Sequence, residues 1–128
     1  MSRPVEYLDL DDVLSLADRL LGPDLGVRDV GLLGSAVARP QTTVGGLDAY
    51  PDIGSKAAAL LQSVVNDHAL VDGNKRLGWL STAVFLELNG VSAATARNDA
   101  VFELVMSVAS QHIEVPVLAE RLRHVVTG

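Results

Sequence analysis

The sequence predicts an all-α fold, a compact bundle of about six helices that carries one small β-hairpin flap. Apolar residues recur along most of the chain at the three-and-four spacing of a helix. The helical stretches begin at Asp or end at Gly or Pro, and β-branched residues followed by a glycine pair occur in one place. The 128 residues are enough for one core, and no linker or low-complexity tract interrupts them, so residues 1–128 are expected to form a single domain.

Two helices are predicted in the first third of the chain. Residues 7–23 have Asp9 as their N-cap and end at a Gly-Pro pair. Residues 27–40 have Asp29 near their start and Pro40 at their end. The apolar face of the first helix consists of Leu10, Val13, Leu14, Ala17 and Leu21.

Residues 41–52 are the one region that predicts strands, as a short hairpin or flap whose Thr42–Val44 edge could receive an extended target segment. Asp52 caps the next helix. The remaining helices are expected at 52–69, 74–90, 97–111 and 115–126. One apolar stripe of the first of these contains Ala57, Leu60, Leu61, Val64 and His68.

Composition excludes several classes of protein. The net charge of −6 argues against broad binding to nucleic acid or to an anionic membrane. No apolar stretch is long enough to span a bilayer, and the N-terminus has acids where a signal peptide needs an apolar run, so a cytoplasmic location is expected. The chain has no Cys and therefore no disulfide or thiolate metal site. An apolar content of 48% without a membrane segment predicts a surface that a partner covers.

One of the two lysines, Lys75, stands beside Arg76 in the first turn of the predicted helix 74–90. A helix N-terminus carries partial positive charge, so each cation there costs about 0.3–1 kcal/mol. A bound anion would remove this conflict, because the free backbone N–H groups and both cations would face it. Gly73 would let the backbone approach the anion closely. The segment therefore predicts a phosphate cradle.

Two residues just before the cradle add reactive groups. His68 could take a proton from an incoming hydroxyl, and Asp72 could hold Mg²⁺ together with phosphate oxygens. Structural alternatives stay open: a core histidine at His68, an N-cap at Asp72 and a turn residue at Asn74. A base, a metal ligand and a phosphate clamp within nine residues are typical of a phosphotransfer site.

Residues 68–76 read HALVDGNKR and resemble the Fic/Doc family motif, H-x-F-x-[DE]-G-N-[GK]-R, at six of its seven specified positions. The upstream segment LLGSAVARPQTTVGG is similar to the helix and flap that precede the motif in this family. The downstream segments FLELNG and VLAERLR resemble the Doc branch. The resemblance covers almost the whole chain and implies the Fic/Doc fold.

The resemblance also implies a role for each motif residue. His68 matches the catalytic base and Asp72 the metal-binding acid. Lys75 stands where AMP-transferring Fic enzymes have Gly and Doc has Lys. This match implies that the nucleotide binds in the reverse orientation to that in the AMP-transferring enzymes. The implied reaction uses ATP and Mg²⁺ to transfer the γ-phosphate to a threonine of elongation factor Tu, which arrests translation. The residues that match the anion hole for the nucleotide phosphates are Gly73, Asn74, Lys75 and Arg76.

The sequence departs from the family pattern at two positions. Leu70 replaces the Phe that anchors the loop in the core, and Trp79 replaces the second Arg of Fic enzymes, which disfavours AMP transfer. The inhibitory motif [ST]-x-x-x-E-[GN] is absent, so the implied inhibitor is a separate Phd-like antitoxin chain.

Two other functions stay open. The first is a Fic-type protein adenylyltransferase, which Lys75 and Trp79 disfavour. The second is a catalytically inactive helical binding module that keeps the nucleotide loop for stability, and the intact His68, Asp72, Asn74 and Arg76 argue against it.

Overall fold

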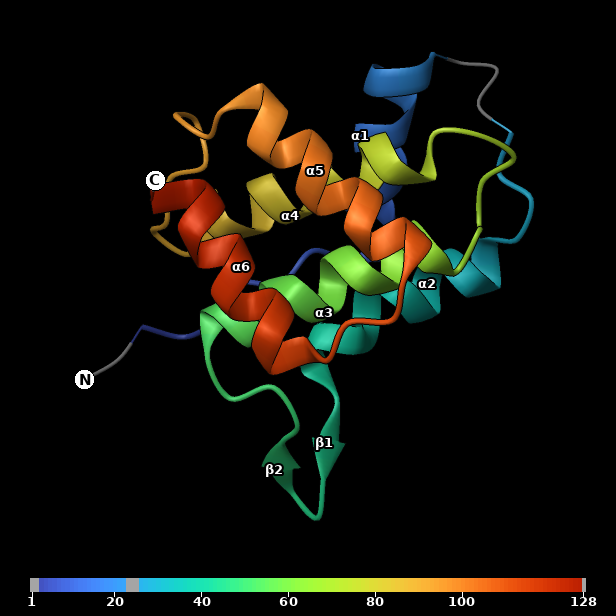
Figure 1. The fold of residues 1–128 in the computed structure, drawn as a ribbon. Helices are drawn as coiled ribbons and strands as arrows, with labels where there is room; N and C mark the ends of the chain where they lie inside the picture. Colours follow the sequence, from blue (N-terminus) through green and yellow to red (C-terminus); the bar gives the residue numbers. More distant parts are fainter. Residues whose placement is uncertain (1–2, 23–25, 128) are drawn as a thin grey trace.

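The computed structural model describes residues 3–22 and 26–127, which form six α-helices and one β-hairpin (Figure 1). The all-α prediction with a small hairpin is therefore confirmed. Within the described residues, no helix is long and apolar enough to cross a membrane. The elements in chain order are α1 (Leu10–Leu21), α2 (Val30–Ala38), a 3-10 turn η1 (Arg39–Gln41), β1 (Thr43–Val44), β2 (Leu47–Asp48), α3 (Ile53–Asn66), α4 (Asn74–Leu88), α5 (Asn98–Ser110) and α6 (Val115–Thr127).

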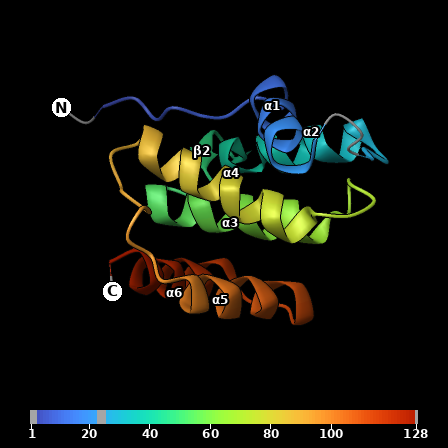
Figure 2. The ribbon, with the colours of Figure 1, turned by 90° about the horizontal axis from the view of Figure 1, so that it is seen from above.

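The helices are stacked in three layers, which are seen from above in Figure 2. The middle layer consists of α3 and α4, with α1 and α2 on one side and α5 and α6 on the other. Every residue of α3 from Ser55 to Val65 is buried. The backbones of α3 and α4 approach each other closely at Gly78 of α4. A Cβ atom built on this glycine would lie only 2.6 Å from Cγ2 of Val65 in α3. The buried core of the protein therefore extends to the end of α3.

The aspartates predicted at the helix starts cap their helices. Asp9 and Asp52 each form a reciprocal capping box with the third residue of the helix, and Asp29 accepts a hydrogen bond from an amide N–H of α2. These local interactions stabilise a helix by about 1 kcal/mol per cap. Gly22 ends α1 as predicted, while Pro23 lies outside the described residues.

The hairpin occurs where the sequence predicts it, although Pro40 does not itself end α2. The helix stops at Ala38, and Pro40 lies in η1, which leads into β1. Thr43 pairs with Asp48 and Val44 with Leu47, around the glycine pair 45–46. Both glycines have positive φ, as a two-residue hairpin turn with the twist of the strands requires.

Two cations of the helical body hold the returning arm of the hairpin. Lys56 of α3 is only 1% exposed, and its Nζ donates to Asp48 Oδ2 at 3.1 Å and to the carbonyl of Tyr50. Arg39 donates from Nε to the Tyr50 hydroxyl at 3.0 Å. The hairpin itself is exposed and projects from the bundle (Figure 1).

The end of α3 differs from the prediction. The helix stops at Asn66 rather than Ala69, and Asp67 is its C-cap. His68 has φ +52° and is exposed, so it does not lie on the apolar stripe and is not a core histidine. The reason is non-local, because residues after His68 form backbone hydrogen bonds with residues 26–29 instead of extending the helix.

Candidate active site

The predicted site residues lie together where α3 ends and α4 begins. Residues 67–73, named here the motif loop, connect the two helices, and in Figure 1 they form the yellow-green loop on the right. The side chains of His68, Asp72, Lys75 and Arg76 are exposed, whereas Gly73 is buried and Asn74 is half-buried. The fold therefore presents four reactive or charged groups on one accessible end of the bundle.

Leu70 anchors the motif loop in the core, the role that the family gives to Phe. It is 1% exposed and forms an antiparallel bridge with Val27. The Asn74 side chain binds the backbone of Leu70 twice: its Oδ1 accepts from the Leu70 N–H, and its Nδ2 donates to the Leu70 carbonyl, each at 3.0 Å. The Asn74 amide side chain is thus engaged within the loop, which leaves its backbone N–H as its contact for an anion.

Residues 26–29 hold the other edge of the motif loop. The amides of Arg28 and Asp29 donate to the carbonyl of Ala69, at 2.7 and 3.1 Å, and the amide of Val71 donates to the carbonyl of Gly26 at 2.7 Å. These bonds join two segments that are about 40 positions apart in the sequence. The loop is therefore a fixed structure rather than a free connection between helices.

His68 has a backbone conformation that requires support. A non-glycine residue in the left-handed region costs roughly 1–2 kcal/mol. The carbonyl of His68 accepts a hydrogen bond from Nη2 of Arg28 at 2.9 Å. Because this bond is exposed to solvent, it directs the carbonyl and contributes little to the stability of the whole fold. Among the described residues, no side-chain hydrogen bond occupies the His68 ring, so the ring is free to accept a proton.

The N-terminus of α4 differs from those of α1, α2 and α3, which Asp side chains cap. Its N-cap is Gly73, no side chain caps it, and its first turn contains no acid. Within the described chain, the amides of Asn74, Lys75 and Arg76 have no hydrogen-bond acceptor. Three free N–H groups, the helix dipole and two cations at one helix end are the features that favour anion binding.

Gly73 is required by two separate constraints. Its φ is +90°, and a Cβ atom there would lie 2.8 Å from Cδ1 and Cδ2 of Leu21. The N-cap interpretation of Asp72 is wrong, because Gly73 occupies that position. Asp72 instead accepts from the N–H of Gly73 through Oδ1 at 2.8 Å. This bond ties the carboxylate to the residue that begins α4.

The donor set at Asp72 fits Mg²⁺ but not a metal held by protein alone. Within the described residues, no group of three or more His, Cys, Asp or Glu side chains could hold a metal ion. Asp72 Oδ2 has no protein partner in that part of the chain. Mg²⁺ is commonly held by one or two carboxylates together with substrate phosphates and waters. A single exposed carboxylate beside a phosphate cradle matches that requirement.

Asp67, which the sequence analysis passed over, lies beside the proposed base. Burial raises the pKa of the Asp67 carboxyl, while the charges of Arg39 and His68 act in the opposite direction.

Two further histidines are surface residues. His112 Nε2 lies 3.1 Å from Glu114, and His124 Nε2 lies 3.3 Å from Glu120; all four side chains are largely exposed.

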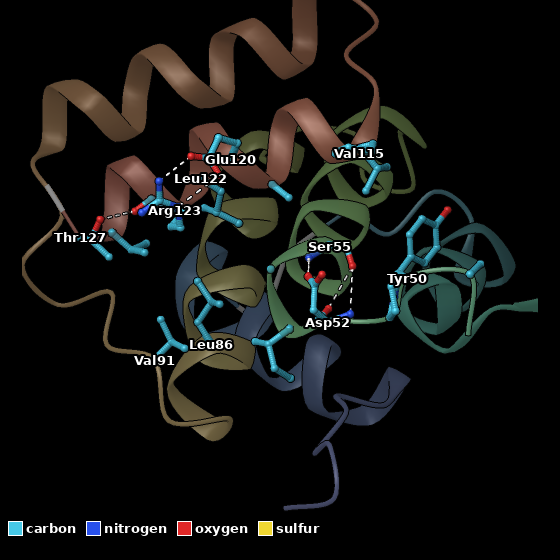
Figure 3. A pocket seen from close by; sticks show the side chains of 17 residues that line it. Tyr50, Asp52, Ser55, Leu86, Val91, Val115, Glu120, Leu122, Arg123 and Thr127 are labelled. Atoms are coloured by element: carbon cyan, nitrogen blue, oxygen red, sulfur yellow. Dashed lines mark hydrogen bonds and ion pairs between the residues drawn. The ribbon is translucent and has the colours of Figure 1, made fainter. Parts of the chain in front are cut away.

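Two of the cavities among the described residues bear on where the site lies. One of about 770 Å³, shown in Figure 3, lies between α6, the end of α4 and the segment that leads into α3. None of the predicted site residues lines it, so size alone does not identify the reactive centre. A second, of about 460 Å³, lies between α1, α4 and α5, and Lys75, Arg76 and Trp79 line its edge. It continues over the exposed apolar side chains of Phe102 and Met106.

The sequence analysis missed Arg28, which contacts His68 directly. Arg28 lies 40 positions upstream of His68 and outside the motif. No local pattern distinguishes it, because its role depends on the pairing of segment 26–29 with the motif loop.

Comparison with known proteins agrees with this geometry. A family model described as the Fic/DOC family matches residues 7–86, which extend from the segment before α1 through the hairpin, α3 and the motif loop into α4. The chain is 50% identical over 118 residues, 91% of each chain, to a protein named Toxin Doc from Mycolicibacterium smegmatis (strain ATCC 700084 / mc(2)155). The matched region contains the motif loop with His68 and Asp72, and the first turn of α4 with Lys75 and Arg76. This chain belongs to the Fic/DOC family, in its Doc toxin branch.

Proposed function

We propose that this protein is the toxin of a toxin–antitoxin system and a protein kinase of the Doc type. It transfers the γ-phosphate of ATP to a threonine hydroxyl of elongation factor Tu and thereby arrests translation in the cytoplasm. The observation that carries the proposal is the uncapped N-terminus of α4, with Lys75 and Arg76 in its first turn, next to the free ring of His68. Phosphate affinity and a base thus occur at one site.

In the proposed reaction, His68 accepts the proton of the target hydroxyl as its oxygen attacks the γ-phosphorus. The bond from the γ-phosphorus to the bridging oxygen breaks, and ADP leaves with the electron pair. Negative charge on the transferred group is stabilised by Lys75, Arg76 and the free amides of α4. The left-handed backbone at His68 directs its exposed ring away from the core.

Asp72 would hold Mg²⁺ together with the phosphates. The ion supplies charge neutralisation for the polyphosphate when bound. The protein contributes the position of Asp72, which the hydrogen bond to the Gly73 amide fixes.

The target segment is proposed to bind beside the hairpin. Exposed strands offer unpaired backbone groups, to which an extended peptide can add as a further strand. In the hairpin, Val44 and Leu47 are 71% and 76% exposed, so apolar contacts are available next to that backbone edge. Lys56 and Arg39 hold the arm of the hairpin in place, so the edge is offered in a fixed position.

The proposed inhibitor is a separate Phd-like antitoxin whose helix covers the cavity between α1, α4 and α5. Phe102 is 66% exposed and Met106 is 40% exposed, and they would receive apolar anchors spaced along one helix face. Lys75 and Arg76 line the same cavity, so an acidic residue of the partner could occupy the phosphate position. Binding of the antitoxin helix there would both cover the apolar surface and block the reaction.

The second candidate function is AMP transfer. The position of a radioactive label in ATP distinguishes AMP transfer from phosphate transfer. The protein is incubated with elongation factor Tu, Mg²⁺ and ATP that carries ³²P at either the α or the γ position. Transfer of the γ label, with a mass gain of about 80 Da, supports the kinase. Transfer of the α label, with a gain of about 329 Da, supports the adenylyltransferase. Absence of both labels would favour the inactive binding module.

Lys75→Gly tests whether this cation sets the direction of the nucleotide. The Lys75 side chain adds positive charge to the anion site, and the phosphate chain will rest where that charge is densest. We expect the variant to lose γ-phosphate transfer and to gain at most a trace of AMP transfer, because Trp79 still replaces the second Arg. Wild-type γ transfer by Lys75→Gly would contradict this role.

A further inference from the structure

Arg28, which lies outside the family motif, contacts the backbone of His68. Its Nη2 donates to the His68 carbonyl at 2.9 Å, and its own backbone amide donates to the next carbonyl, that of Ala69, at 2.7 Å. One residue therefore binds two successive peptide groups of the motif loop. Both contacts are made from residues 26–29, a segment that the motif does not include.

The two contacts of Arg28 have different consequences for the loop. The backbone contact to Ala69 is shared with the amide of Asp29, so the loop keeps a donor there whatever side chain stands at position 28. The side-chain contact to the His68 carbonyl has no second donor within the described residues. That carbonyl belongs to the residue whose φ is +52°. The guanidinium therefore acts where the backbone conformation is least favourable.

The direction of the His68 ring depends on its backbone. The ring is exposed, and no side-chain hydrogen bond in the described structure orients it. The backbone angles φ and ψ therefore set where the Cα–Cβ bond of His68 points, and Arg28 binds the carbonyl of that same residue. A base that is displaced by about 1 Å from its acceptor proton can lose about a hundredfold in rate.

We infer that Arg28 is a positioning residue that holds the His68 carbonyl and so presents the His68 ring to the target hydroxyl. This role rests on the proposed function of His68 as the base. Arg28 forms no ion pair within the described residues, and its side chain is exposed, so its side-chain contact with the loop is the interaction that the structure assigns to it. The phosphate cradle on α4 does not depend on this contact.

The test compares Arg28→Ala, Arg28→Lys and the matched control Arg19→Ala, which removes the same charge from an exposed position on α1. We expect Arg28→Ala to lower kcat for phosphate transfer about 10–100-fold while KM for ATP changes by less than about twofold. Arg28→Lys keeps a cationic donor and should recover part of kcat. Free guanidinium ion should also raise kcat of Arg28→Ala but not of the wild type.

Amide hydrogen exchange gives a readout that does not require activity. Arg28→Ala should speed exchange at Leu70 and Val71 of the motif loop, with no change in the buried amides of α3 and with an unchanged Tm. Exchange and kcat equal to those of Arg19→Ala would overturn the inference. A lower Tm without rescue by guanidinium would overturn it as well. If the wild type transfers no phosphate, the proposed function fails, and the exchange rates alone then decide whether Arg28 holds the loop.

Discussion

Substitution of Asn74 separates two roles that the motif residue could have. The family resemblance assigns Asn74 to the phosphate site, whereas its side chain here binds both polar groups of the Leu70 backbone. Asn74→Ala removes two hydrogen bonds, each of which contributes about 1–1.5 kcal/mol. Leu70 is 1% exposed, so water compensates the loss only in part. We therefore expect the free energy of unfolding to fall by about 2–3 kcal/mol.

Urea unfolding followed by circular dichroism measures this loss, and titration calorimetry measures ATP affinity in the same variant. Asn74→Asp is the matched control. It keeps an acceptor for the Leu70 N–H, but it places a carboxylate against the Leu70 carbonyl and near the phosphate site. It should lose stability and ATP affinity together, whereas Asn74→Ala should lose mainly stability. If Asn74→Ala unfolds like the wild type but binds ATP more than tenfold more weakly, the side chain is a phosphate ligand and does not hold the motif loop.

Three other substitutions test the site and its surroundings. His68→Ala should lower the transfer rate by about 10²–10⁴ without changing the Tm, because general-base help is lost and the side chain is exposed; an unchanged rate would exclude His68 as the base. Gly78→Ala should lower the free energy of unfolding by about 0.5–2 kcal/mol. Overpacking against Val65 at 2.6 Å costs about 1–3 kcal/mol, and the better helix propensity of Ala returns about 1 kcal/mol at most. Urea unfolding like that of the wild type would mean that the Val65 side chain moves aside freely. Phe102→Ser should weaken antitoxin binding while activity and Tm stay as in the wild type, because this side chain is 66% exposed; unchanged affinity in calorimetry would place the antitoxin elsewhere.

The features that the sequence predicts well are local. The caps at Asp9, Asp29 and Asp52 were predictable because a capping side chain binds amides within three residues of itself. The hairpin was predictable because the glycine pair 45–46 meets the positive φ of a two-residue turn. The clustering of charged residues at the start of α4 was also predictable. The motif spans nine consecutive residues, which cannot lie far apart in space.

The parts that could not be predicted depend on contacts between distant segments. The helical periodicity of the sequence predicts a helix that continues through His68. In the structure α3 ends at Asn66, and the backbone after His68 pairs with residues 26–29. The bridge between Val27 and Leu70 has no signature in either segment. Arg28 was missed for the same reason. The packing of Leu21 against Gly73 likewise requires the position of α1 relative to the motif loop.

The motif loop and the start of α4 are built on opposite principles, and the difference explains the site. In the loop, protein partners occupy the backbone groups: the His68 carbonyl binds Arg28, and both polar groups of Leu70 bind Asn74. At the start of α4, no side chain occupies the free amides, and two cations stand in the first turn, whereas Asp side chains cap α1, α2 and α3. A satisfied loop is rigid and keeps the base in place, because moving it breaks several hydrogen bonds at once. An unsatisfied helix end is stabilised when it binds a phosphate, because the anion supplies the missing hydrogen-bond acceptor and the missing negative charge. Rigidity and the capacity to bind an anion therefore come from adjacent backbone segments, which in the proposed reaction would bring His68 to the transferred group.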